Sequence, residues 1–223
     1  RPDEVIVFAP PLEKKIELSV MTTDDDTLPW AGHSALYAMP RIYELLRQNN
    51  TTLVFVNTRA QAEMVFQALW NLNDDHLKIG LHHGSLDVQQ RRRVEAMMAE
   101  GALDAVVATS SLDLGIDWAE IDLVIQVGAP KGTARLIQRV GRSGHRLDAP
   151  LRAVLVPANR FEMLEVLAAR LSVNDGALDP IEIHEGALDI LAQHLVGRAV
   201  AGPFEADKLY AQICTAAAYR SLT

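Results

Sequence analysis

The run from Ala105 to Ala108 is apolar at every position, which predicts a buried strand of a parallel sheet. A small polar turn, Thr109 to Ser111, follows the run, and a Gly-Ile-Asp step comes next at residues 115–117. Open α/β sheets bind their ligands at the carboxyl ends of such strands. The sequence therefore predicts a binding site at this turn.

Other short apolar runs are predicted as strands, and segments with apolar residues three or four positions apart are predicted as helices. The expected strands are residues 16–20, at an edge, and 51–56, 78–81, 105–108, 122–128 and 151–156. The expected helices are residues 39–48, 60–72, 87–100, 133–140 and 161–171. The predicted fold class is α/β, a parallel sheet flanked by helices.

Composition limits the class of protein. The chain has 223 residues, of which 49% are hydrophobic, so it can bury a substantial core. Its one cysteine, Cys214, excludes an internal disulfide framework and is expected to be a buried thiol in a reducing compartment. Neither a secretory signal nor a membrane span is indicated, and a cytoplasmic location is expected.

The formal net charge of −8 argues against general attraction to nucleic acid. Basic residues nevertheless cluster at Arg91–Arg93 and between Lys131 and Arg146, so a basic seam on an acidic body remains open. The arginine run is interpreted as a solvated helix face. Trp30 has no basic neighbours in the sequence, and we expect it to be a packing residue and not a base-stacking platform.

Several motifs in a fixed order carry a family resemblance. They are Pro29–His33, Val54–Arg59, His82–Leu86, Thr109–Asp117, Gly128–Gly132, Gln138–Arg146, Gln193–Val196 and Tyr219–Leu222. As a set they resemble the second RecA-like motor domain of superfamily-two helicases. Within that group the chain is most similar to the Lhr type and to the bacterial ligase-associated, Lhr-like DExH helicases.

The resemblance implies two domains. Residues 1–175 correspond to a RecA-like helicase C-terminal motor domain, which follows the P-loop NTPase pattern. Residues 176–223 correspond to the start of a winged-helix domain, expected to be small, helical and incomplete, with two helices joined at Gly202-Pro203. Because the chain begins at Arg1, we expect it to be part of a longer protein.

The resemblance also assigns contacts with a nucleic-acid strand. The residues concerned are Asn57, Arg59, His83, Gly84, Ser85, Thr109 and Ser110. Hydroxyl and backbone groups at such turns position a phosphodiester without reading bases. Helix capping is an alternative role for Thr58, and Ser85 is expected to cap the helix 87–100. No metal site is expected, because the adjacent His82 and His83 point apart.

Nucleotide contacts are implied at two further motifs. Arg142 is the expected arginine finger, whose planar donors stabilise a transferring γ-phosphate, and Gln138 orients or senses the same group. The family's second arginine falls at His145, with Arg146 one residue later, and which of the two serves is open. The remaining cofactor contacts are Gly115, Asp117 and Arg139, although Asp117 can also be a turn cap.

The sequence contains neither a phosphate-cradling Gly-x-x-x-x-Gly-Lys-Ser/Thr loop nor an Asp-Glu-x-His strand end. We therefore expect this chain alone to be inactive, with ATP and Mg²⁺ held mainly by a first RecA-like domain elsewhere. The implied function is that of an ATP-dependent 3'-5' DNA helicase in DNA repair, acting on single-stranded DNA or a tailed duplex, with a DNA ligase and a nuclease as partners. One alternative is unwinding of RNA or RNA:DNA. Another is a non-catalytic binding module, and the presence of Gln138 and Arg142 argues against this second alternative.

Overall fold

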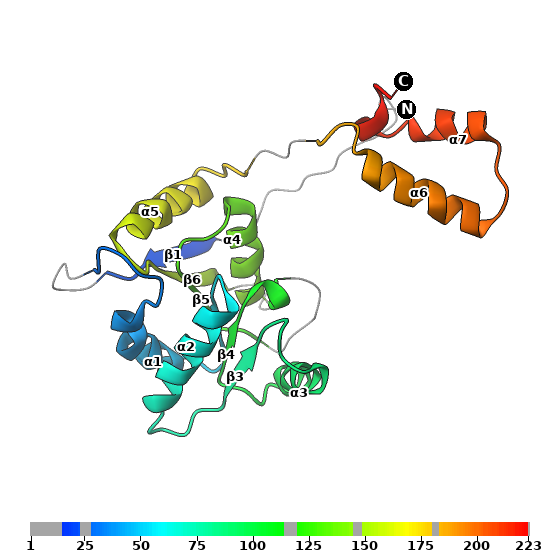
Figure 1. Ribbon diagram of the computed structural model, residues 1–223. Coiled ribbons are helices and arrows are strands. Elements are labelled where there is room, and N and C mark those ends of the chain that lie inside the picture. Colours follow the sequence, from blue (N-terminus) through cyan, green and yellow to red (C-terminus); the bar gives the residue numbers. More distant parts are fainter. Residues whose placement is uncertain (1–14, 23–27, 114–119, 145–148, 180–182, 223) are drawn as a thin grey trace. The chain divides into compact units, whose positions relative to one another are not determined.

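The computed structural model describes residues 15–22, 28–113, 120–144, 149–179 and 183–222. The chain divides into two compact units, residues 1–179 and residues 180–223 (Figure 1). In the first unit, strands and helices alternate along the chain, as the sequence predicts. The second unit is helical in its described part.

The described residues of the first unit form one six-stranded sheet in the order β1-β6-β5-β2-β4-β3. Its strands are β1 Ile16–Val20, β2 Thr52–Phe55, β3 Ile79–His82, β4 Ala105–Ala108, β5 Leu123–Val127 and β6 Leu151–Val156. All neighbouring strands pair in parallel. The predicted α/β class with a parallel sheet is confirmed, and β1 is an edge strand as expected.

Helices cover both faces of this sheet. They are α1 Met39–Gln48, α2 Arg59–Asn71, α3 Val88–Ala99, α4 Thr133–Val140 and α5 Arg160–Asn174. One core holds buried side chains of α1 and α2, such as Ile42 and Leu69, together with Val54 of β2. The other core holds α3, α4 and α5 side chains together with Phe55 of β2. Successive β2 residues thus point to opposite faces, so both faces of the strand are buried.

Side-chain caps mark the starts of helices α2, α3 and α5. Thr58 accepts a hydrogen bond from the Gln61 amide, so its predicted capping role at α2 is confirmed. The expected cap of the helix at residues 87–100 was wrong, because Asp87 and not Ser85 accepts the Gln89 amide at the start of α3. A carboxylate fits this position because it also meets the positive end of the helix dipole.

The second unit contains α6 Leu188–Ala201 and α7 Ala206–Ile213, on either side of Gly202-Pro203. In this unit the Tyr219 hydroxyl donates a hydrogen bond to the Ala187 carbonyl, which precedes α6, at 2.8 Å. Cys214 is half-buried and not fully buried as expected. Among the described residues, no helix has the length and apolar character needed to cross a membrane.

Candidate functional site

The turns that follow the strands lie at one edge of the sheet, because all its strands run in the same direction. The turn after β2 carries residues 57–59, the turn after β3 carries residues 83–85, and the turn after β4 carries residues 109–111. These three strands are neighbours in the sheet, in the order β2, β4, β3. Most of the residues assigned to nucleic-acid contact therefore lie on one edge.

Arg59 and Ser85 come together across this edge. The Arg59 Nη1 donates to the Ser85 Oγ at 3.1 Å, and both residues are exposed. Gly84 is also exposed, and a Cβ added there would meet no atom within 4 Å. Ser110 is the fourth exposed residue, at the start of a 3-10 turn, Ser110–Leu112. Together these residues present a guanidinium, hydroxyls and open backbone to the outside, which suits contact with phosphates.

The Asn57 side chain makes hydrogen bonds within the protein. Its Nδ2 donates to the Ala129 carbonyl at 2.8 Å, and its Oδ1 accepts from the Gln126 Nε2 at 3.5 Å. The side chain thereby joins the turn after β2 to the turn after β5. Gly128, with φ +83°, is required beside it, because a Cβ there would lie 2.9 Å from the Asn57 Nδ2. The geometry gives Asn57 a positioning role at the edge.

The two adjacent histidines point to different partners, as expected for neighbouring residues at a strand end. The His83 Nε2 lies 3.3 Å from Glu63 Oε1, while the His82 Nε2 lies 3.0 Å from Glu95 Oε1. Both imidazoles are buried, so His83 does not reach the surface where the sequence analysis expected a strand contact. No group of three or more His, Cys, Asp or Glu suited to a metal ion occurs in the part of the chain that the structure describes.

His82 organises the turn that carries Thr109. Its carbonyl accepts the Thr109 amide at 3.2 Å and the Ser111 hydroxyl at 3.2 Å. Its Nδ1 lies 2.8 Å from the Ser111 Oγ. The imidazole thus links this turn to Glu95 of α3. Thr109 is half-buried, with its Oγ1 3.4 Å from the Ser111 Oγ.

A buried ion pair joins the turn after β4 to helix α4. Arg139 is only 3% exposed, and its Nε and Nη2 donate to the two carboxylate oxygens of Asp113 at 2.7 and 3.2 Å. The Arg139 Nη1 donates to the Gln126 Oε1 at 2.6 Å, and the guanidinium lies 4.6 Å from the centre of the Phe55 ring. The interior encloses this arginine, so its predicted cofactor contact is replaced by a role in positioning.

Arg142 reaches the same aspartate from the next turn. Its Nη2 donates to the Asp113 backbone carbonyl at 2.7 Å, and the residue is half-buried. Gln138 is exposed on α4, and Arg135 of that helix lies 3.6 Å from the Asp113 carboxylate. Asp113 therefore holds two arginines through different groups. We call Asp113, Arg139 and Arg142 the Asp113 junction.

Three predicted site residues, Gly115, Asp117 and Arg146, lie outside the described residues, as does His145. Two residues that matter at this edge were missed by the sequence analysis. Asp113 is a buried acid next to arginine-rich α4, which is a signal for an ion pair. Glu162 accepts the Ala129 and Ala158 amides at 3.1 and 3.0 Å, and so fastens the turns after β5 and β6.

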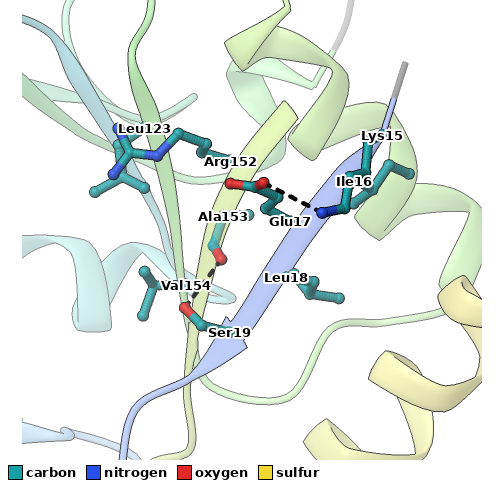
Figure 2. A pocket seen from close by; sticks show the side chains of 9 residues that line it. All are labelled: Lys15, Ile16, Glu17, Leu18, Ser19, Leu123, Arg152, Ala153 and Val154. Atoms are coloured by element: carbon teal, nitrogen blue, oxygen red, sulfur yellow. Dashed lines mark hydrogen bonds and ion pairs between the residues drawn. The ribbon is translucent and has the colours of Figure 1, made fainter. Parts of the chain in front are cut away.

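A separate hollow of about 490 Å³ lies beside the edge strand β1, as Figure 2 shows. Ser19 and Glu17 of β1 and Arg152 and Val154 of β6 line it on one face of the sheet. Within it, Lys15 pairs with Glu17 at 3.6 Å. It holds none of the residues that the sequence analysis assigned to a site.

Comparison with known proteins identifies the family of this chain. Residues 37–146 match the helicase conserved C-terminal domain, and residues 171–223 match the winged helix domain of the large helicase-related protein. The ATP-dependent helicase Lhr-Core of Methanocaldococcus jannaschii is 35% identical over 95% of this chain and 25% of its own length. The Lhr helicase/probable uracil glycosylase of Mycolicibacterium smegmatis is 31% identical over 97% of this chain and 16% of its own length.

A solved structure of the Mycobacterium smegmatis helicase Lhr, bound to ssDNA and AMP-PNP, is also similar. It superposes with a TM-score of 0.85 at 33% identity, over 96% of this chain and 29% of that one. The chain thus spans about a quarter of the length of the Lhr-Core relative. It belongs to the Lhr-type helicases, and it comprises a helicase C-terminal domain of the RecA-like fold and a helical winged-helix segment.

Proposed function

We propose that this chain is the second motor domain of an ATP-dependent 3'-5' DNA helicase, where it supplies an arginine finger and part of the grip on a single strand. The Asp113 junction carries this proposal. It joins the turn with Thr109 and Ser110, assigned to the nucleic acid, to the segment with Gln138 and Arg142, assigned to the nucleotide. A motor needs such a rigid link between its two ligands.

The junction gives its two arginines different tasks. The Asp113 carboxylate forms an ion pair with Arg139, which is buried in the interior. Arg142 donates to the backbone carbonyl of the same residue, so Asp113 also helps to orient this second guanidinium. A guanidinium fixed in this manner can stabilise the charge on a γ-phosphate, and such fingers contribute ~10³ to 10⁵ in rate.

ATP and Mg²⁺ would be held mainly by a first RecA-like domain with a phosphate-cradling loop and a DExH box. ATP would close the two domains, Arg142 would complete the site, and hydrolysis would reopen it. Arg59, Gly84 and Thr109 would grip and release the strand during this cycle. The relatives support this proposal, since one is described as an ATP-dependent helicase and another was solved with ssDNA and AMP-PNP.

The physiological role proposed is DNA repair, as in the ligase-associated helicases that the sequence resembles, with a DNA ligase and a nuclease as partners. The substrate would be single-stranded DNA or a duplex with a single-stranded tail. The exposed groups at the edge are a guanidinium, hydroxyls and backbone, which grip phosphates without reading bases. We therefore expect binding that depends little on base sequence and strongly on salt.

The test uses the full-length protein with Arg142→Ala, and Arg135→Ala as a matched control from α4. Stimulation of ATP hydrolysis by single-stranded DNA should fall at least about 10³-fold in Arg142→Ala, because the finger acts on the transition state. Arg135 is exposed and its contact with the Asp113 carboxylate is long, at 3.6 Å, so its variant should stay close to the parent. An unchanged rate in Arg142→Ala, with folding intact, would remove the finger and the motor proposal with it.

The grip is tested separately with Arg59→Ala. Removing one phosphate contact should weaken binding of all DNA sequences alike and reduce the slope of log affinity against log salt by about one. The same measurement with RNA of matched length compares the two sugars. Binding by Arg59→Ala that equals the parent at every salt concentration would exclude this residue from the grip.

A further inference from the structure

Trp30 lies in Pro29–His33, a motif of the resemblance that the proposed function does not use. Trp30 is 67% exposed, so it does not belong to the buried core. The basic neighbour that the local sequence lacks is supplied from helix α5. The Arg160 guanidinium lies over the indole, 4.4 Å from its ring centre.

The loop that carries Trp30 is firmly held. The Arg160 amide donates to the Pro29 carbonyl, and the Arg160 Nε donates to the Leu28 carbonyl, both at 3.0 Å. Two residues after Trp30, the Asn159 Nδ2 donates to the Gly32 carbonyl at 2.7 Å. A loop held by hydrogen bonds before and after Trp30 loses little conformational freedom when it binds a ligand, which lowers the cost of binding.

The loop also lies at the same edge as the proposed grip. Arg160 follows β6, which is two strands from β2 and the Arg59 turn, or roughly 10 Å at the usual strand spacing. A direct contact connects the two places, since the Gln61 Nε2 donates to the His33 carbonyl at 2.5 Å. A strand held at Arg59 therefore needs to run only a short way along the edge to reach Trp30.

We propose that Trp30, with Arg160 beside it, is a stacking site for a base of the same single strand, beyond the contacts at Arg59. Every base offers a flat face to an indole, so stacking tolerates any sequence, while the arginine adds positive charge for the phosphates. The N-terminal end of α5 adds to that charge through the helix dipole. This inference rests on the proposed function, because it extends the grip.

The test compares Trp30→Ala with Trp70→Ala in the full-length protein. Trp70 is 56% exposed, and it lies near the other end of α2, roughly 16 Å along the helix from Arg59. Affinity for single-stranded oligonucleotides is measured over a series of lengths. Trp30→Ala should weaken binding of the longer strands by roughly five- to a hundredfold and leave the shortest binding strands unchanged. Trp30→Phe should retain most of the affinity, and Trp70→Ala should match the parent.

An abasic position moved along the oligonucleotide locates the stacked base. At one position the abasic site should weaken binding to the parent but not to Trp30→Ala, since the contact is already lost. The inference is overturned if Trp30→Ala binds every length like the parent while Arg59→Ala does not. It is also overturned if Trp30→Ala changes ATP hydrolysis without DNA, which would indicate a contact with another domain. If the parent binds no single strand at all, the proposed function itself fails.

Discussion

Two carboxylates organise the edge of the sheet where the strands end, and they do so in opposite ways. Asp113 gathers guanidinium groups, with Arg139 on its carboxylate and Arg142 on its carbonyl. Glu162 gathers neutral amides, and its Oε2 accepts the N–H groups of Ala129 and Ala158. The first arrangement is a buried charge pair, and the second fastens two turns with ordinary hydrogen bonds.

The difference shows which part of the edge depends on charge. A buried arginine without its carboxylate is an uncompensated charge, which is far more costly than a missing hydrogen bond. The Asp113 junction therefore has little tolerance for change, whereas the Glu162 turns need only an acceptor oxygen. In the proposed motor, the junction connects the two ligands, and the turns at Glu162 support the loop with Trp30.

The largest effect is expected at Asp113. Asp113→Asn keeps the size of the side chain but removes its charge, and leaves Arg139 charged in the interior. We expect the free energy of unfolding to fall by about 3–5 kcal/mol, measured by urea denaturation. Replacing both members of the pair, as Asp113→Leu with Arg139→Met, should recover much of this loss. A cost under ~1 kcal/mol for the single variant would contradict the importance of charge at this position.

A smaller effect is expected at Glu162. Glu162→Gln retains one carbonyl oxygen that can accept both turn amides, so we expect a loss of only about 1 kcal/mol. Glu162→Ala leaves the Ala129 and Ala158 amides without that oxygen, and should cost about 2–3 kcal/mol. The same denaturation experiment checks both values. Equal losses in the two variants would mean that the charge of Glu162, and not its oxygen, fastens the turns.

The charge of Glu162 has one visible consequence at Tyr37. Burial first, and the nearby Glu162 second, raise the pKa of this phenol to about 12. Its hydroxyl therefore stays protonated and donates to the Pro157 carbonyl at 2.5 Å. The phenol keeps its proton in the folded state above the ordinary pKa near 10, where the unfolded chain loses it. Its contribution to stability is thus complete below pH 10 and declines above it.

The elements of the sheet were predictable because each is encoded locally. The predicted bounds of β1, β4, β6, α1 and α4 agree with the structure to the residue. Each has an apolar run, an alternation of apolar and polar residues, or a helical period, and such patterns depend only on neighbours in the sequence. Helix α5 extends three residues beyond its predicted end at Leu171, because the buried Val173 continues its apolar face into the segment assigned to a linker.

The site was predictable only in part, because its partners come from distant segments. Trp30 and Arg160 are 130 residues apart in the sequence, and the residues next to either one do not predict the contact between them. Arg139 was assigned to a cofactor because it lies in a nucleotide motif, whereas its burial depends on Asp113 and Gln126. The sequence indicates which residue types gather at this edge, and the tertiary contacts decide which of them face outward.

The smallest effect is expected at His33, and it separates the remaining functions of Glu162. The His33 Nδ1 lies 3.0 Å from the Glu162 Oε1, on the oxygen that the turn amides do not use, and its side chain is 82% exposed. Exposed pairs of this kind contribute little, so His33→Ala should change the free energy of unfolding by only about 0–1 kcal/mol. Combining it with Glu162→Gln in a double-mutant cycle measures the coupling of the two side chains. A coupling near zero would assign the stabilising effect of Glu162 to the two turn amides, while a coupling above ~1 kcal/mol would show that the loop with Trp30 depends on this carboxylate.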